Sequence, residues 1–415
     1  MPEMLRLVKT LKINTRNIRV LLSGFLILFI VSGVCYYGFG VFFKHIQEEF
    51  GWGRGVISTA FLTFCLVFAF FSPIIGKLID RYGARNVILI GSFLLGSGLI
   101  LLSITTNLQQ FYMAYGIVGL GGSGCGLVSV SSLISEWFSK RRGTALGLVT
   151  SGMGIGGLFM PIIIGNFLIP CFGWRTAYQI LGLLTIAIIT LILMKALPSR
   201  GRPRSGNPQY TNAPPTKSIK EEVLKSALRK STFWLIVCAY ILFEIAETGT
   251  VQHLVIRLID VGFPEAMATF VFSFIGLFNV IGRFLFGYIS DRLAIKFCAI
   301  ISFSSGLVAT TLLMAIIAPS NLLLIYLFIL AMGLTVGSWA PITSMLISTY
   351  FEAARYGTVF GAFSLFFFVS SGVGPALFGY IYDAVHNYNP AYILSLTFYS
   401  IAIILISSLP RQNQS

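Results

Sequence analysis

The chain has 415 residues, of which 56% are apolar and only 10% are charged, and its formal net charge is +15. A soluble domain carries about 25% charged residues, so this composition excludes an ordinary soluble protein. The apolar residues form blocks of roughly 20, the length at which a helix crosses a ~30 Å hydrocarbon core. These runs lack the alternation of barrel strands and therefore predict transmembrane helices in a lipid bilayer.

Twelve apolar blocks follow one another along the chain. The first 19 residues are polar and basic and lack a cleavable signal pattern, so we expect the first block to be a retained helix. The predicted fold is an all-α membrane protein with twelve transmembrane helices. They are expected at residues 20–43, 56–78, 87–105, 109–137, 144–169, 175–197, 232–258, 265–289, 297–317, 321–350, 358–383 and 390–409.

The positive charges are distributed unevenly between the two predicted sides of the membrane. With both termini on one side, that side carries 24 of the 29 Lys and Arg residues. Cytoplasmic loops carry an excess of Lys and Arg, so we expect both termini in the cytoplasm and the chain in the cytoplasmic (plasma or inner) membrane. The net charge then needs no nucleic-acid partner. The remaining five cations are Lys44, Arg54, Arg175 and Arg257 on the opposite side and Arg283 inside a block.

The longest polar break divides the twelve blocks into two sets of six. Its first half is rich in Pro, Gly and Asn, which is typical of a flexible linker. We therefore expect an N-terminal six-helix bundle at 1–197, a cytoplasmic linker at 198–231 and a C-terminal six-helix bundle at 232–415.

Short segments repeat between the two sets of blocks. "GKLIDR" (76–81) is similar to "GYISDR" (287–292), and "LISEWFSKRRGTALG" (133–147) is similar to "LISTYFEAARYGTVFG" (346–361). A six-plus-six parallel repeat is typical of a major-facilitator-type transporter, with the substrate site between the halves near mid-membrane.

The pattern G-x-x-x-D-R-x-G-x-R, which begins at Gly76, resembles the loop motif of the major facilitator superfamily. Within this superfamily, four segments resemble the monocarboxylate and oxalate:formate transporter branch: "FGWGRGVISTAF" (50–61), "WFSKRRGTALGL" (137–148), "FGWRTAY" (172–178) and "HLV" (253–255). The resemblance implies alternating access by two rocking bundles, and it implies neither a bound cofactor nor a metal.

The loop motif recurs in the second half and predicts an inner gate. Its acidic residues can attract helix N-termini, and its arginines can pair with carboxylates across the seam between the halves. Such clusters would lock the cytoplasmic side when the protein faces outward; the alternative is an ordinary charged loop. The predicted gating residues are Gly76, Asp80, Arg81, Arg85, Gly287, Asp291 and Arg292.

The seventh block contains Glu244, Glu247 and His253. Ionisable residues within a membrane span face the bundle interior and are functional candidates. The two glutamates are three residues apart and share a helix face, and burial favours the protonated form of a carboxyl group. They are therefore candidates for proton coupling, with interfacial or structural positions as the alternative. The resemblance places His253 near the substrate, so it is a candidate for both binding and proton coupling.

Arg283 lies in the oily run "FNVIGRFLFG" (278–287). It precedes Asp291 by eight residues, about 12 Å of helix, so it lies deep within a ~30 Å core. A guanidinium fork binds a carboxylate bidentately and keeps its charge. Its repeat equivalent is Ser72, so the charge is not required by the internal symmetry. The resemblance implies a substrate-binding arginine at this position, whereas a salt bridge to Glu244 or Glu247 is the structural alternative.

The chain departs from the related carriers at three positions. Tyr37 stands where animal monocarboxylate carriers have a lysine, and Asn279 stands where they have an aspartate. Phe363 stands where the oxalate:formate exchanger has a second cation. A single fixed cation favours a monoanion. Core packing is the alternative role for the further binding candidates, which are Tyr36, Tyr37, Asn279, Trp339 and Tyr382.

No Ser/His/Asp, Walker or metal-ligand arrangement has usable spacing, so we do not expect an enzyme. The sequence predicts a monomeric secondary active transporter for a small organic monocarboxylate such as lactate or pyruvate, either coupled to H+ or not. The alternatives are an organic anion exchanger, a drug or solute efflux transporter, and a membrane sensor that does not transport.

Overall fold

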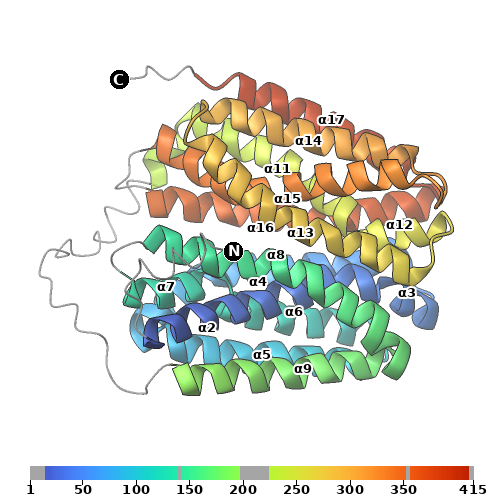
Figure 1. Cartoon of the computed structure of the whole chain (residues 1–415), viewed down its shortest axis with the longest axis horizontal. Coiled ribbons are helices and arrows are strands. Elements are labelled where there is room, and N and C mark those ends of the chain that lie inside the picture. Colours follow the sequence, from blue (N-terminus) through green and yellow to red (C-terminus); the bar gives the residue numbers. More distant parts are fainter. Residues whose placement is uncertain (1–14, 139–141, 197–223, 352–355, 411–415) are drawn as a thin grey trace, which may run out of the picture.

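The structure is a computed structural model that describes residues 15–138, 142–196, 224–351 and 356–410. Most of the linker expected at 198–231 lies outside these residues. The described residues of the first half form a series of long helices (Figure 1). Their bounds are α2 (Thr15–Val31), η1 (Ser32–Tyr37), α3 (Gly38–Phe50), α4 (Arg54–Tyr82), α5 (Ala84–Ser103), α6 (Leu108–Cys125), α7 (Leu127–Trp137), α8 (Arg142–Ile163), η2 (Ile164–Leu168) and α9 (Ile169–Ala196).

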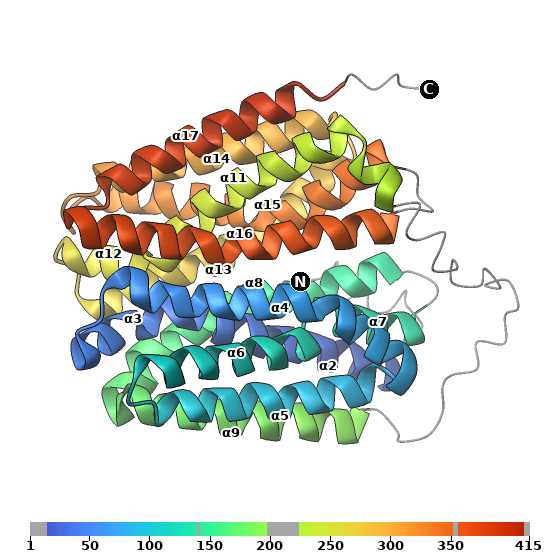
Figure 2. The same cartoon turned by 180° about the vertical axis from the view of Figure 1, so that it is seen from behind.

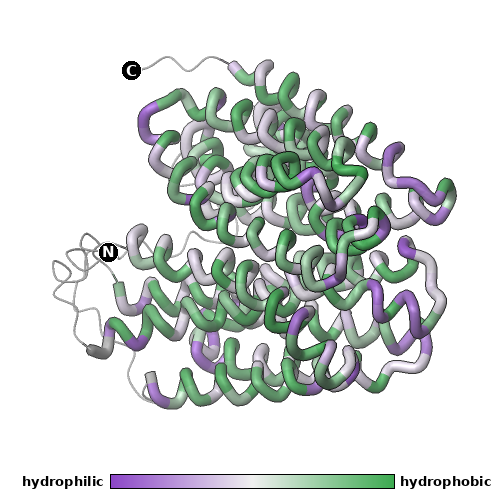
Figure 3. Tube along the Cα trace, turned by 45° about the vertical axis from the view of Figure 1, so that its right-hand side comes forward, coloured by the Kyte–Doolittle hydropathy of each residue, from purple (hydrophilic) through white to green (hydrophobic). Residues whose placement is uncertain are grey.

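The second half is built in the same way and ends at Ser407. Its described elements are α11 (Ser231–Gln252), α12 (Leu254–Asp260), α13 (Glu265–Ser290), α14 (Ile295–Ala315), α15 (Leu322–Tyr350), α16 (Tyr356–Val385) and α17 (Asn389–Ser407). Helices form here because a membrane span must satisfy its backbone hydrogen bonds within itself. Hydrophobic residues follow the spans, and hydrophilic residues gather at helix ends and connections (Figure 3).

Eleven continuous helical stretches in the described residues are long and apolar enough to cross a membrane. One of them, residues 143–195, is long enough for two crossings. It is interrupted at Gly173, whose φ of 77° lies in the left-handed region that favours glycine. The chain reverses near this point, so that α9 returns along α5 and α2 (Figure 1). The predicted all-α membrane fold is therefore confirmed.

The helices form two groups, with α2–α9 in one and α11–α17 in the other (Figures 1 and 2). The groups meet where α4 packs on α16 and α8 packs on α13. Small residues permit this contact: a Cβ on Gly276 would overlap the backbone of Gly157 and Leu158. Close approach at glycines is how transmembrane helices pack without a hydrophobic driving force.

The two ends of the bundle differ in how the halves are joined. We call the end where α4 and α13 begin the Arg54 end, and the opposite end the Asp80 end. One buried core runs through the first half and continues into the second half at the Arg54 end, where it includes Phe272 and Phe378. The second half has a separate core toward the Asp80 end, which includes Phe233 and Phe286. The halves thus share a core at one end only.

Candidate functional site

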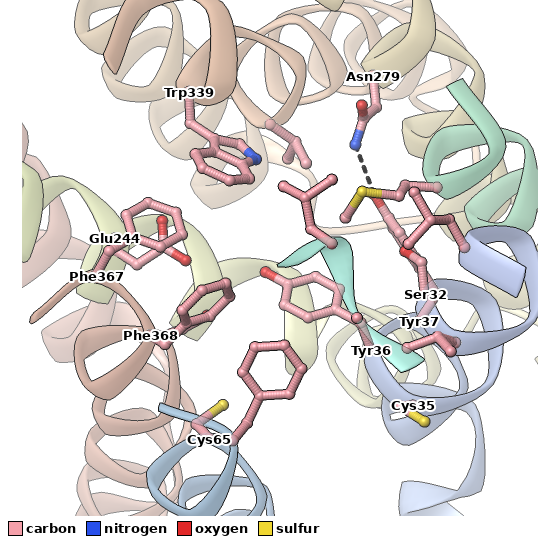
Figure 4. Close-up of a pocket in the computed structure, with 18 of the residues that line it drawn as sticks. Ser32, Cys35, Tyr36, Tyr37, Cys65, Glu244, Asn279, Trp339, Phe367 and Phe368 are labelled. Atoms are coloured by element: carbon pink, nitrogen blue, oxygen red, sulfur yellow. Dashed lines mark hydrogen bonds between the residues drawn. The ribbon is translucent and has the colours of Figure 1, made fainter. Parts of the chain in front are cut away.

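A cavity of about 120 Å³ lies between the two halves, within the membrane-spanning region. Its walls come from both halves and are mostly apolar (Figure 4). Seven of the residues singled out in the sequence line it. They are Tyr36, Tyr37, Glu244, Glu247, Asn279, Arg283 and Trp339.

A chain of polar groups crosses from one half to the other along one side of the cavity. Asn279 Nδ2 donates a hydrogen bond to Tyr37 Oη at 2.9 Å (Figure 4). Arg283 Nη2 lies 3.4 Å from Asn279 Oδ1, one helical turn away on α13. Tyr37 belongs to the first half and the other two residues to the second. The arrangement therefore gives an anion three potential hydrogen-bond donors that converge from both halves.

The Arg283 guanidinium is poorly satisfied by the protein. Its Nη1 donates to the carbonyl oxygen of Thr150 at a long 3.3 Å and lies 3.9 Å from Met153 Sδ. The buried Nε has no hydrogen-bond partner. Within the part of the chain that the structure describes, Arg283 forms no ion pair with a carboxylate. The salt bridge to Glu244 or Glu247, which was the structural alternative, is therefore not formed.

Glu244 and Glu247 project from α11 into the same cavity. Each is only 2% exposed, and one carboxyl oxygen of each has no hydrogen-bond partner. Neither forms an ion pair with a cation among the described residues. Glu244 lies across the cavity from Asn279 (Figure 4). One buried oxygen of each carboxyl group is therefore without a partner in the part of the chain that the structure describes.

The backbone is irregular where it borders the cavity. The first span contains the π-helical turn η1, which carries Tyr36 and Tyr37. The fourth span breaks at Gly126, where the backbone is extended between α6 and α7. Such π segments are frequent at functional sites. The two tyrosines thus come from a local distortion that apolar periodicity does not reveal.

Arg54 joins the two halves at the Arg54 end. It is 5% exposed and binds the carboxylate of Asp260 through two hydrogen bonds of 2.6 and 2.9 Å. It also donates to Tyr388 Oη at 2.9 Å, and its guanidinium lies 3.8 Å from the ring centre of Tyr382. A bidentate pair of this kind is among the stronger charge interactions in proteins.

A carboxylate of the second half also caps a helix of the first half. Asp383 accepts hydrogen bonds of 2.8 Å from the backbone N–H groups of Arg54 and Gly55. These groups open α4 and have no partner within the helix. A negative charge at this position also interacts favourably with the helix dipole. The start of α4 is therefore completed by α16.

His253 and Tyr382, both predicted to bind substrate, lie at the Arg54 end and do not line the cavity. His253 is fully buried, with Nδ1 2.8 Å from Tyr388 Oη and Nε2 3.1 Å from Ser58 Oγ. Its Nε2 also lies 2.9 Å from the carbonyl oxygen of Pro375. In this conformation His253 belongs to the contacts between the halves.

A second polar cluster closes the Arg54 end. Glu265, at the start of α13, forms an ion pair with Lys44 at 2.8 Å and a 2.6 Å contact with His45. Both partners belong to α3 in the first half. Together with the Arg54 contacts, this cluster ties the two halves together at the Arg54 end.

The predicted gating residues at the Asp80 end are not joined. Asp80, Arg81, Asp291 and Arg292 are exposed and form no ion pairs with the rest of the described chain. A Cβ built on Gly76 or on Gly287 would meet no atom within 4 Å, and buried Arg85 Nε has no hydrogen-bond partner. Among the described residues, the ion pairs that join the two halves lie at the Arg54 end, and the gating role of the residues at the Asp80 end stays a prediction.

The group of residues that joins the two halves at the Arg54 end was not predicted from the sequence. These residues are scattered over the chain and meet only in the folded protein. One signal was present: Arg54, Asp260 and Asp383 are among the few charges on a side that is poor in them. Charged residues on the side of the membrane with few charges are candidates for ion pairs between the two halves.

Breaking this group should open the Arg54 end. We expect Arg54→Gln to raise the rate at which a cysteine placed at the buried position Ser58 reacts with a thiol reagent. Losing one partner of a buried ion pair costs about 3–5 kcal/mol, so an increase of tenfold or more is expected. The measurement uses a chain whose natural cysteines have been replaced.

Arg175→Gln is the matched control, because Arg175 pairs with Glu49 inside the first half. The labelling rate should not change in this variant. An unchanged rate in Arg54→Gln would show that the Arg54 contacts do not hold this end closed.

The structure does not suggest a metal centre. Within residues 15–138, 142–196, 224–351 and 356–410, no group of three His, Cys, Asp or Glu side chains could hold a metal ion.

A bundle of two helix groups with a cavity at their seam is the architecture of membrane transporters. The profile of the Major Facilitator Superfamily matches residues 25–375, and the chain belongs to this family. The predicted superfamily resemblance is confirmed. The chain is 26% identical over 395 residues to monocarboxylate transporter 13 of Rattus norvegicus, covering 94% of this chain and 88% of that one. It is 26% identical over 373 residues to MFS-type transporter 1 of Ophiocordyceps sp., covering 86% and 77%.

Solved structures share the fold. A bacterial homologue of the human lysosomal transporter Spinster, inward-facing and unoccupied, has a TM-score of 0.76 at 16% identity, with 95% of this chain and 97% of that chain covered. The nucleoside transporter NupG has a TM-score of 0.78 at 13% identity, with 95% and 98% covered.

Proposed function

We propose that the protein is a secondary active transporter that moves a small organic monocarboxylate, such as lactate or pyruvate, across the cytoplasmic membrane by alternating access. The observation that carries this proposal is Arg283. Its guanidinium lines the cavity, keeps an unpaired Nε–H and forms no ion pair with a described carboxylate. A substrate carboxylate would supply the missing partner.

The free-energy cost of a buried charge favours a substrate-binding role for Arg283 over a structural role. A charge inside a membrane is expensive and persists where it serves function. A structural arginine would be paired, because an unpaired buried ion costs several kcal/mol. The guanidinium of Arg283 makes only long hydrogen bonds, to the Thr150 carbonyl oxygen at 3.3 Å and to Asn279 Oδ1 at 3.4 Å. Its site is therefore prepared for a ligand that comes and goes.

The charge of the cavity favours a monoanion. Arg283 is the one cation among the residues that line it. Phe363, at the position where the related exchanger has a second cation, is 2% exposed and packs against Tyr240 and Phe367. A dianion would leave one carboxylate without a cation.

Alternating access assigns roles to the two ends. The Arg54 contacts close one side in the present conformation, and the Asp80 and Asp291 loops would lock the other side after the bundles rock. The rocking units are the predicted bundles 1–197 and 232–415, joined by the linker. Together with the charge bias, these roles support a cytoplasmic position for the Asp80 end and for both termini. We propose that one monomer suffices.

Proton coupling is proposed for Glu244 and Glu247. They face the same cavity as Arg283 and have unpartnered oxygens. A protonated carboxyl group in the cavity is neutral and does not repel the substrate anion. An ionised carboxylate would weaken binding of the anion by repulsion. Protonation would thus accompany binding of the carboxylate, which is symport with H+.

Uptake by proteoliposomes tests the proposal. Purified protein in liposomes should accumulate labelled lactate, pyruvate or a related monocarboxylate above the level of protein-free liposomes. Accumulation should saturate with concentration, and unlabelled monocarboxylate should compete. Absence of saturable uptake for every monocarboxylate tested would contradict the proposed function.

A second candidate is efflux of amphipathic solutes. The two acidic side chains in a largely apolar cavity favour it, since they could bind a cationic compound. An efflux carrier of this kind would not need Arg283, whereas a carboxylate transporter would. Loss of transport in Arg283 variants therefore separates the two candidates. An organic anion exchanger is a third candidate, and an imposed pH gradient would not drive uptake by it.

A further inference from the structure

The walls of the cavity carry a dense set of aromatic side chains. Besides Tyr37, the aromatic residues that line it are Tyr36, Phe64, Phe68, Trp339, Phe367 and Phe368. They come from both halves. Tyr36, Trp339 and Phe368 lie between Asn279 and Glu244 (Figure 4). A site for an acid as small as lactate does not require aromatic walls of this extent.

We infer that the preferred substrate carries an aromatic ring next to its carboxylate. This inference rests on the proposed function and specifies its substrate class. Arg283, with Asn279, would hold the carboxylate, and the ring would lie among the aromatic side chains. Ring faces and edges attract one another in stacked and edge-to-face arrangements at centroid distances of about 4.5–7 Å.

The ring geometry leaves surfaces available for such contacts. Trp339 stacks on Phe367 with centroids 4.6 Å apart and an angle of 25°. Phe68 and Phe368 meet across the seam at 4.8 Å. Phe367 is nearly buried, at 5% exposure, while Trp339 and Phe368 are partly exposed. Phe367 thus packs against one face of the Trp339 ring. The exposed surfaces of Trp339 and Phe368 are available to a ligand.

The separation of polar groups supports the same class of substrate. Asn279 and Glu244 lie on opposite sides of the cavity with aromatic side chains between them (Figure 4). A ligand that reaches Arg283 with its carboxylate presents its body to this aromatic region. Burying an apolar body there is favourable, whereas a methyl group such as that of lactate would leave most of the aromatic surface without contacts.

The test compares lactate with 3-phenyllactate, which differs only by the ring. Uptake kinetics are measured in proteoliposomes, with protein-free liposomes subtracted. The wild-type protein is expected to have a KM for 3-phenyllactate at least roughly tenfold lower than for lactate, because a buried phenyl group contributes this much or more.

Phe368→Leu tests the role of the aromatic wall. The variant should raise the ratio of the KM for 3-phenyllactate to the KM for lactate by roughly threefold or more. Lactate uptake also shows that the variant is folded. Phe297→Leu, at a 63% exposed position on α14, is the matched control and should change neither value.

The outcomes separate this inference from the proposed function. Equal KM values for the two acids, or an equal effect of Phe368→Leu on both, would overturn the ring preference and leave monocarboxylate transport intact. Absence of saturable uptake for both acids would overturn the proposed function and the inference with it.

Discussion

Arg283→Gln is expected to lower kcat/KM for monocarboxylate uptake by roughly 30-fold or more. Removing one partner of a buried, hydrogen-bonded charge pair costs about 2–5 kcal/mol, and about 1.4 kcal/mol is a factor of ten. The loss is large because the cavity holds no second cation that could replace the guanidinium. Glutamine keeps a hydrogen-bond donor of similar reach but removes the charge. Initial rates of labelled uptake in proteoliposomes measure the effect.

Arg283→Lys should recover only part of this loss. Lysine restores the charge but not the planar fork that binds both carboxylate oxygens. Arg19→Gln is the matched control, because Arg19 is exposed near the start of α2 and should be dispensable. Wild-type uptake by Arg283→Gln would remove the carboxylate assignment and favour the efflux candidate.

Replacing the two buried glutamates is expected to abolish the drive from a proton gradient. In the wild-type protein, an inward gradient of one pH unit supplies about 1.4 kcal/mol per proton, which is sufficient for about tenfold accumulation of the acid. Glu244→Gln, Glu247→Gln or the double variant should lose this accumulation, because glutamine cannot carry the proton. Exchange of labelled for unlabelled substrate should continue, since it needs no net proton movement.

Glu48→Gln controls for the loss of a carboxylate elsewhere. Glu48 lies on α3 with its side chain 61% exposed and outside the cavity. The pH gradient should drive this variant as well as the wild type. If the gradient does not affect the wild-type protein, proton coupling is excluded and a uniporter or an anion exchanger is left. If it drives the double glutamate variant normally, the proton is carried by another group.

The fold could be predicted because the membrane leaves few options. Twelve apolar blocks must become helices, and the repeats at 76–81 and 287–292 relate the two halves. The boundary between the fifth and sixth spans also follows from sequence, since the two blocks expected at 144–169 and 175–197 flank Gly173. The structure joins these blocks into one helical stretch with a break at that glycine.

Some residues of the cavity could be predicted from their depth within the membrane spans. Arg283 and the glutamates stand out because ionisable residues are rare in apolar spans, and the structure places all three around one cavity. Tyr37 and Asn279 were singled out at positions where related carriers have charges. The structure joins them by a hydrogen bond that no local pattern encodes.

The closed end could not be predicted from local patterns. Arg54, Asp260 and Asp383 are separated by more than 100 residues, and their contacts depend on how the two halves are docked. His253 illustrates the same limit. Sequence similarity favoured a place near the substrate, whereas the structure places it in the seam with Ser58. The position of a residue along a span therefore does not reveal whether its side chain lines the cavity or packs in the contact between the halves.

The central claim is that Arg283 holds the carboxylate of the substrate, and a thermodynamic cycle tests it most directly. Calorimetry compares the binding of 3-phenyllactate and its amide to the purified wild-type protein and to Arg283→Gln. The wild type should prefer the acid over the amide, and the variant should lose this preference, with a coupling energy of about 2 kcal/mol or more. An equal preference for the acid in both proteins would contradict the claim.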